Sequence, residues 1–151
     1  MFRSKSIRML VCDMAGTTIQ EKGIVYNSLY KTVKLIKPKL MKSEIEQFSG
    51  YNKLEVIKYF VEQQKMDSPT TVINNLDSEF NYYLKKEYSN NDSVKLIHPA
   101  LLPYFNVLRY NDIKICLNTG YNKDIQTLLI DKLGMLDYID DYISSEEVDR
   151  G

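Results

Sequence analysis

Side chains that could do chemistry are concentrated in two short segments, each behind a mostly apolar run. The first segment is DMAGTT at 13–18, which follows the run 7–12. A carboxylate at the end of a buried strand offers a nucleophilic oxygen, and the small residues behind it offer amides and hydroxyls that suit phosphoryl oxygens. Asp13 could equally cap a turn that uses Gly16 for its positive φ, so this segment alone leaves both interpretations open.

The second segment is NTG at 118–120, which follows the apolar run 113–117. Both runs are typical of strands in a parallel sheet, because they are nearly continuous in apolar residues and end in turn residues. Parallel α/β sheets bind ligands at the carboxyl ends of their strands. We therefore expect Asp13 and the Thr119-Gly120 pair to lie at one common site.

Cysteine and histidine chemistry has little support in the sequence. Cys12 and Cys116 are the two cysteines, and their apolar surroundings favour buried free thiols over a disulfide or a metal site. His98 is the single histidine, which argues against most zinc sites, and its place before Pro99 favours a structural role. An enzyme built from this chain must use carboxylates, lysines and backbone amides.

A long helical stretch separates the two candidate strands. Apolar residues recur at intervals of three and four within 25–36, 45–48, 54–61 and 72–88, which predicts four helices. Ser68-Pro69 is a typical start for the last of these helices. The shift from strand to all-helical pattern indicates a helical unit inserted after the first strand of an α/β unit.

Strand and helix alternate again after this stretch. Residues 101–108 predict one helix, and a second helix begins at its cap Asn122 and closes at Gly134. A third, weaker strand is expected at 138–143. The chain of 151 residues thus fits an α/β fold with a parallel sheet and an inserted helical unit.

Charge and hydropathy exclude several classes of partner. The 20 Lys+Arg balance the 20 Asp+Glu, so the chain as a whole offers no basic footprint for nucleic acid and no basic surface for anionic lipid. The longest apolar stretch near the start is too short for a membrane span or a signal sequence. We expect a cytoplasmic protein that binds neither nucleic acid nor membrane.

Four segments together resemble the haloacid dehalogenase superfamily of hydrolases. MLVCDMAGTT at 9–18 is similar to its first motif, in the form found in the phosphonoacetaldehyde hydrolase (phosphonatase) branch, where DxAGTT replaces the commoner DxD. LNTGY at 117–121 resembles the second motif. GYNKL at 50–54 resembles the Gly-x-x-Lys segment of the family's helical cap, and 144–151 resembles the run that leads to the third motif.

The resemblance implies a fold and a mechanism. The fold would be a Rossmann-like three-layer core from 1–19 and 93–151, with an α-helical cap at 20–92. Asp13 would attack phosphorus and, together with the backbone carbonyl of Ala15, bind Mg²⁺. In such covalent catalysis the metal and nearby dipoles neutralise the developing charge. The residues implied to bind the phosphoryl group of a small phosphate or phosphonate substrate are Gly16, Thr17, Thr119 and Gly120.

Ala15 and Lys53 determine which reaction the resemblance implies. Ala15 stands where phosphatases of the superfamily carry a carboxylate that protonates an alcohol leaving group, so it favours a leaving group that needs no proton. Lys53 matches the Schiff-base lysine that phosphonatase uses to break a P–C bond. Val56 and Ser49 differ from the His and Met of that enzyme's cap, so Lys53 could instead be a solvated lysine at a helix start.

The resemblance also implies that part of the site would follow Gly151. The third-motif base and the fourth-motif acidic residues would lie beyond it, and Glu146 and Glu147 come too early to replace the latter. The chain then looks truncated before the third motif, with an incomplete sheet. We expect this chain alone to be weakly active or inactive and to self-associate, with a homodimer as one form. The alternative is a catalytically inactive domain with a binding or structural role.

Overall fold

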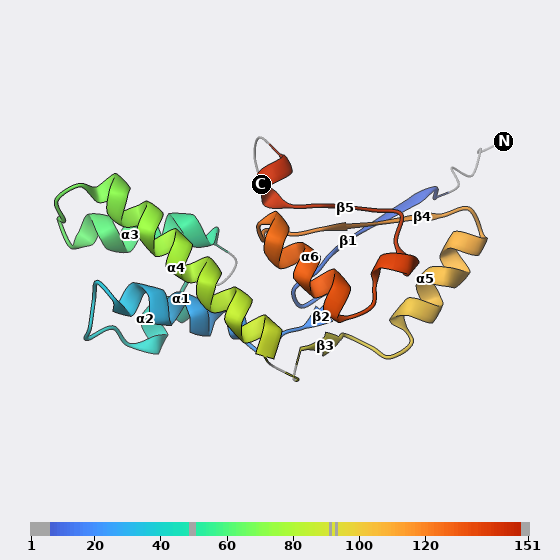
Figure 1. Cartoon of the computed structure of the whole chain (residues 1–151), viewed down its shortest axis with the longest axis horizontal. Coiled ribbons are helices and arrows are strands. Elements are labelled where there is room, and N and C mark those ends of the chain that lie inside the picture. The colour runs from blue at the N-terminus through green and yellow to red at the C-terminus, as the bar shows by residue number, and fades with distance from the viewer. Residues whose placement is uncertain (1–6, 49–50, 91, 93, 149–151) are drawn as a thin grey trace. The chain divides into compact units, whose positions relative to one another are not determined.

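Three parallel strands form the sheet of one of two compact units (Figure 1). The computed structural model describes residues 7–48, 51–90, 92 and 94–148. One unit consists of the described residues of 1–22 and 92–151, and the other of those of 23–91. The strands lie in the order β1 (Met9–Asp13), β4 (Lys114–Asn118) and β5 (Asp141–Ile143).

Helices join the parallel strands. The segment before β4 contains α5 (Leu101–Tyr110), and the segment from β4 to β5 contains α6 (Lys123–Lys132) and the 3-10 helix η1 (Leu136–Tyr138). Successive right-handed connections across a sheet in one direction place their helices on one side, and Figure 1 shows α5 and α6 both beneath the sheet. Ile115 and Leu117 of β4 are fully buried. The predicted α/β class with a parallel sheet is therefore confirmed.

The first strand is less buried than its apolar sequence predicts. Met9 is 56% exposed and Val11 is 54% exposed. The register pairs Val11 with Cys116, so these side chains lie on the face opposite to Ile115 and Leu117. The prediction of a buried strand is wrong for this face, because α5 and α6 cover only the other one.

The third strand is shorter than predicted. Residues 136–138 form η1, and β5 begins only at Asp141. Asp140, just before it, accepts the Ile115 amide at 2.9 Å and forms ion pairs with Lys114 and Arg109, each at 3.3 Å. The Ile115 amide is the main reason why the pKa of Asp140 lies below its ordinary value. A carboxylate thus anchors the start of β5 to β4.

A short antiparallel pair, absent from the sequence-based expectations, lies where the chain leaves and re-enters the sheet-containing unit. It consists of β2 (Ile19–Gln20) and β3 (Lys95–Leu96). The Ile97 amide extends the pair by donating to the Thr18 carbonyl at 2.9 Å. The pair thereby joins the two chain segments that flank the helical unit.

The helical unit contains the four helices that the periodicity predicts. They are α1 (Ile24–Lys34), α2 (Lys42–Glu46), α3 (Lys53–Gln63) and α4 (Pro69–Asn90). Within the described part of the chain, no helix combines the length and apolar character needed to cross a membrane. The core of this unit includes the buried side chains of Val25, Leu29, Val33, Ile45, Val56, Ile57, Phe60, Val61, Leu76, Phe80, Leu84 and Tyr88.

The open face of the sheet predicts self-association. Parallel sheets are normally covered on both faces, and exposed apolar patches and free strand edges attract further protein. We expect the 151-residue chain to form dimers or larger species in sedimentation velocity. Val11→Lys should shift the distribution toward monomer, because it places a charge in the middle of this face.

Val107→Lys is the matched control. Val107 is 57% exposed on α5, away from the open face, and its substitution should leave the distribution unchanged. A wild-type chain that remains monomeric at all concentrations would contradict the prediction.

Candidate active site

The ends of β1 and β4 bring the two chemistry-bearing segments together. Asp13 is the last residue of β1 and pairs with Asn118, the last residue of β4. Thr119 and Gly120 follow Asn118 at the same carboxyl edge of the sheet, which is where α/β folds bind ligands. Asp13 and Gly120 are exposed at this edge.

Two threonines hold the Asp13 segment. The Thr17 hydroxyl donates to Asp13 Oδ2 at 3.2 Å, and the buried Thr18 hydroxyl donates to the Asp13 carbonyl at 3.1 Å. The first bond restrains the carboxylate through one of its oxygens. The second fixes the backbone from which that carboxylate projects.

The amides behind Asp13 serve the loop itself. Gly16, in the left-handed conformation with φ +80°, donates its amide to the Ile19 carbonyl at 2.8 Å. The amides of residues 17, 18 and 19 all donate to the Met14 carbonyl, at 3.2, 3.0 and 2.8 Å. These four amides therefore shape the turn, and the hydroxyl of Thr17 is the polar group of residues 16–19 that lies against the carboxylate.

The loop after β4 leaves space at its glycine. The Thr119 hydroxyl accepts the Tyr121 amide at 3.3 Å, and Asn122 caps α6 by accepting the Ile125 amide at 3.0 Å. A Cβ added at Gly120 would meet no heavy atom of the described residues within 4 Å. An anionic group could thus approach the backbone beside the N-terminus of α6, which favours negative charge.

A third segment, behind β5, is tied to the same loop, and these contacts were not among the sequence-based expectations. Ser145 in η2 (Ser145–Glu147) donates its hydroxyl to the Tyr121 carbonyl at 2.9 Å. The Lys123 amide donates to Glu146 at 2.8 Å, and the Lys123 ammonium lies 3.0 Å from Glu147. The spacing Ser144-x-x-Glu147 is a capping-box pattern that could have indicated this turn.

Glu147 is held in its charged form by this turn. The Ser144 amide, the Lys123 ammonium and the Ser144 hydroxyl lower the pKa of Glu147 from 4.5 to about 2. Among the described residues, its close partners belong to the turn or to Lys123. Glu147 thus connects the end of β5 to α6.

Few side chains near the ends of β1 and β4 could bind a metal ion. Among the described residues, no three His, Cys, Asp or Glu side chains converge as a metal centre would require. Cys12 and Cys116 are free, as predicted, although half-buried rather than buried. Burial is the main cause that raises the pKa of both thiols, which favours the neutral thiol over the thiolate. Asp13 is then the carboxylate at the ends of β1 and β4 that could bind a cation.

Lys53 lies in the helical unit, as the first residue of α3. Its ammonium donates to the Tyr51 carbonyl at 2.6 Å and lies 4.9 Å from the centre of the Tyr26 ring. Val56, one turn further along α3, is buried in the core of this unit. Ser49 and Gly50 of the predicted cap motif lie outside the described residues.

The remaining candidates have simpler surroundings. Ala15 forms an isolated bridge with Ile19 and belongs to the turn behind Asp13. His98 Nδ1 accepts the Ala100 amide at 3.1 Å, and its carbonyl accepts the Leu101 amide at 3.1 Å. His98 thus shapes the start of α5.

This chain belongs to the haloacid dehalogenase-like hydrolase family, whose model matches residues 10–151. It is similar in fold to a hydrolase from Pseudomonas syringae, with a TM-score of 0.75 and 14% identity over 97% of this chain and 64% of that one. It is also similar to a predicted phosphoglycolate phosphatase from Haemophilus somnus, with a TM-score of 0.73 and 11% identity over 95% of this chain and 65% of that one. A third similar structure is a family IA, variant 3 hydrolase from Entamoeba histolytica, with a TM-score of 0.72 and 16% identity over 97% of this chain and 64% of that one.

The chain spans about two thirds of the length of these solved structures, and their low identities establish the fold alone. No curated protein matches it. The family assignment confirms the resemblance to haloacid dehalogenase-type hydrolases.

The contacts of Glu147 in the turn behind β5 can be tested by titrating its carboxyl group. In Lys123→Ala the pKa of Glu147 should rise from about 2 but stay below 4.5, because the Ser144 amide, its strongest partner, remains. Since the folded-state pKa is lowered, the stability that Glu147 contributes is present above pH 4.5 and is lost as the pH falls toward 2. Carboxyl ¹³C NMR over this range measures the pKa directly.

Lys114→Ala serves as the control, because Lys114 pairs with Asp140 and should leave Glu147 unaffected. An ordinary pKa near 4.5 for Glu147 in the wild-type protein would show that the turn does not form.

Proposed function

We propose that this chain carries the nucleophile of a Mg²⁺-dependent hydrolase that acts on a small phosphonate or a small phosphate monoester. The observation that supports the proposal is the placement of Asp13, an exposed carboxylate at the end of β1, beside the end of β4 and in contact with the Thr17 hydroxyl. The family assignment supports hydrolysis as the type of reaction.

Asp13 would act by covalent catalysis. A carboxylate oxygen attacks phosphorus, an aspartyl-phosphate bond forms, and the bond from phosphorus to the leaving group breaks. Water then hydrolyses the acyl phosphate and regenerates Asp13. The Thr119 hydroxyl and the Gly120 amide would donate to the phosphoryl oxygens, whose negative charge such donors stabilise. The Thr17 hydroxyl would join them when its proton turns from Asp13 to the substrate.

The protein side of a Mg²⁺ site would consist of the Asp13 carboxylate and the Ala15 carbonyl. Mg²⁺ commonly uses one or two carboxylates and completes its shell with water and substrate phosphate, so this donor set fits the ion when the substrate is bound. When bound, the ion would neutralise charge on the phosphoryl group.

The residue at position 15 supports a phosphonate as substrate. Ala15 cannot donate a proton, so a leaving group that departs without general acid catalysis fits this turn better than an alkoxide. Lys53 would supply what such a reaction needs. Its amine condenses with an aldehyde carbonyl and releases water, and the electrons of the P–C bond then pass into the resulting imine to give an enamine. Protonation of the enamine carbon and hydrolysis of the imine release the aldehyde product and regenerate Lys53.

A catalytically inactive domain with a binding or structural role is the second candidate. The observation that favours it is that, in the described part of the chain, Asp13 is the single carboxylate at the ends of β1 and β4, while Glu147 is engaged by Ser144 and Lys123. The two candidates differ in whether this chain turns over any phosphonate or phosphate monoester.

Asp13→Asn tests the nucleophile. The amide has nearly the same shape and can still accept the Thr17 hydroxyl, so the melting temperature should change little. Hydrolysis of p-nitrophenyl phosphate and phosphonoacetaldehyde with Mg²⁺ should fall at least about a hundredfold, because an amide is a poor nucleophile.

Asp131→Asn is the matched control, since Asp131 is exposed on α6, and it should retain the wild-type rate. Residual activity above a few per cent in Asp13→Asn would assign Asp13 a structural role. A wild-type chain no faster than Asp13→Asn would favour the inactive domain.

Lys53 is tested by reductive trapping. Borohydride added with phosphonoacetaldehyde should fix a covalent adduct on Lys53, identified by peptide mass spectrometry, if the imine forms. Lys53→Arg should abolish the adduct, whereas Lys58→Arg, which changes a lysine of the same helix, should retain it. Hydrolysis of phosphate esters without any adduct would instead indicate a plain phosphatase.

A further inference from the structure

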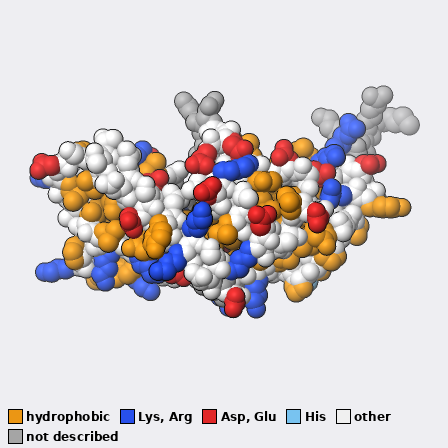
Figure 2. Space-filling model, in the orientation of Figure 1, with side chains coloured by type: hydrophobic (Ala, Val, Ile, Leu, Met, Phe, Trp, Pro, Cys, Tyr) orange, Lys and Arg blue, Asp and Glu red, His pale blue; other side chains and the backbone are white. Residues whose placement is uncertain are grey.

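A basic and apolar surface lies at one end of the helical unit, between α1 and α2. Residues 31–42 contain five lysines and no acidic residue. Figure 2 shows Lys and Arg side chains gathered near the lower edge of the molecule, where Figure 1 draws α1 and α2. The expectation that the chain does not bind membrane rests on the zero net charge of the whole chain, which does not describe this strongly positive segment.

Two of the five lysines are used within the unit. Lys31 forms an ion pair with Glu87 of α4 at 2.6 Å. Lys37 forms an ion pair with Glu44 and lies over the Phe60 ring. These contacts fix α1 and the start of α2, and they leave the other three lysines as the source of the surface charge.

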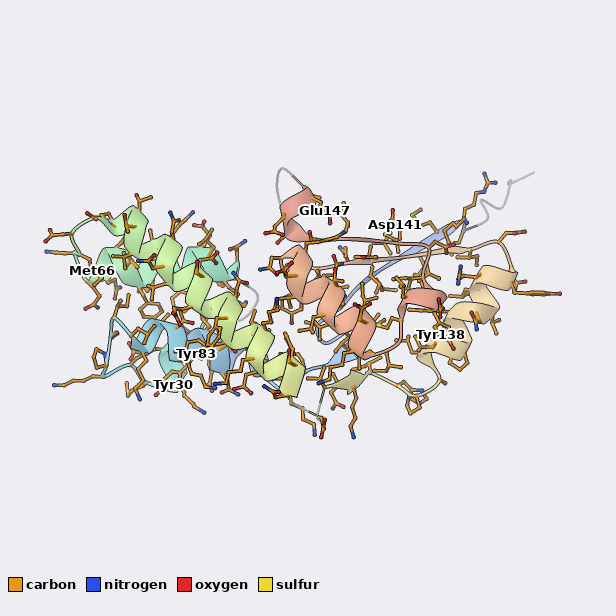
Figure 3. All side chains as sticks on the ribbon, in the orientation of Figure 1. Tyr30, Met66, Tyr83, Tyr138, Asp141 and Glu147 are labelled. Carbon is orange, nitrogen blue, oxygen red and sulfur yellow. The ribbon has the colours of Figure 1, made fainter. Side chains whose placement is uncertain are left out.

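Two of the other three lysines, Lys34 and Lys42, lie against Tyr30, which Figure 3 labels at this edge of the helical unit. Lys34 lies 5.3 Å and Lys42 lies 5.9 Å from the centre of the Tyr30 ring, so their ammonium groups converge from two elements. The Tyr30 hydroxyl lies 3.4 Å from the Leu40 carbonyl, next to Lys39. Among the described residues, no carboxylate lies within ion-pair distance of Lys34, Lys39 or Lys42.

Two large apolar side chains adjacent to these lysines in the sequence are exposed. Leu35 is 54% exposed next to Lys34, and Met41 is 63% exposed next to Lys42. The exposed parts of Leu35 and Met41 do not pack in the core of the helical unit. An apolar side chain flanked by lysines can enter the headgroup region of a bilayer while the ammonium groups meet lipid phosphates.

We propose that this surface, formed by Tyr30, Lys34, Leu35, Lys39, Met41 and Lys42, docks onto an anionic membrane. The positive charge calls for an anionic partner, and the projecting Leu35 and Met41 distinguish the possible partners. A nucleic acid backbone is bound by positive charges and gains nothing from exposed aliphatic side chains. A peptide-binding surface would hold such side chains within a groove rather than project them into solvent. The proposal is independent of the proposed hydrolase function.

Vesicle co-sedimentation tests the proposal. The wild-type chain should bind vesicles of phosphatidylcholine with 30% phosphatidylserine, should not bind pure phosphatidylcholine, and should dissociate as salt is raised from 0.1 M to 1 M. Each lysine near an anionic surface contributes about fivefold to binding. The triple change Lys34→Glu, Lys39→Glu and Lys42→Glu should therefore lower partitioning at least about a hundredfold.

The matched control changes Lys65, Lys86 and Lys95 to Glu, which gives the same net charge away from this surface. It should retain most of the binding. Leu35→Ser with Met41→Ser should also weaken binding, whereas Val107→Ser should not. The melting temperature of each variant shows that it is folded.

Several outcomes would overturn the proposal. They are no binding of the wild type to the anionic vesicles, equal loss in both lysine triples, and no effect of the Leu35 and Met41 changes. Tighter binding of a single-stranded oligonucleotide or an acidic peptide, lost in the first triple but not in the double serine variant, would instead assign the surface to that partner.

Discussion

The pairing of β1 with β4 is the interaction on which the candidate site depends. Five consecutive residues of each strand are in parallel register, and the pairing ends at Asp13 and Asn118. A shift of the register by one residue would turn Asp13 to the opposite face of the sheet, next to the helices. The half-buried side chains of Leu10 and Cys12 oppose such a shift, because it would turn them to the exposed face of the sheet. Packing of the core thus fixes the position of the carboxylate.

The helical unit is inserted where it leaves this register undisturbed. The chain turns after Asp13, forms β2, and returns through β3, so the two ends of the insertion are joined by backbone hydrogen bonds. The turn itself is closed by four amides that bond within it. Because these restraints are local, residues 23–91 can fold around a core of their own without altering the strand ends.

The repetitive parts of this structure could be predicted from the sequence, whereas the parts that depend on contacts with distant segments could not. Helix periodicity, the Ser68-Pro69 start and the cap Asn122 are local signals, and α4 and α6 begin where these signals place them. The exposure of Met9 and Val11 depends on whether anything covers the second face, which no strand sequence records. β2 and β3 have two residues each, too few for a pattern. The use of the loop amides by Met14 likewise follows only from the folded turn.

The residues proposed for catalysis are divided between the two units: the groups for phosphoryl transfer lie in the sheet-containing unit, and Lys53 lies in the helical unit. The groups proposed to bind and attack phosphorus all lie on the β1 and β4 ends, and they do not depend on the nature of the leaving group. Ala15 removes the general acid from that set, so help for the leaving group must come from the substrate or from another part of the chain. Lys53 is the candidate for that help, and its contacts with Tyr51 and Tyr26 hold it within the helical unit. Under the proposed function, loss of Asp13 removes phosphoryl transfer altogether, whereas loss of Lys53 removes only cleavage of the P–C bond, so the two roles are separable in the protein.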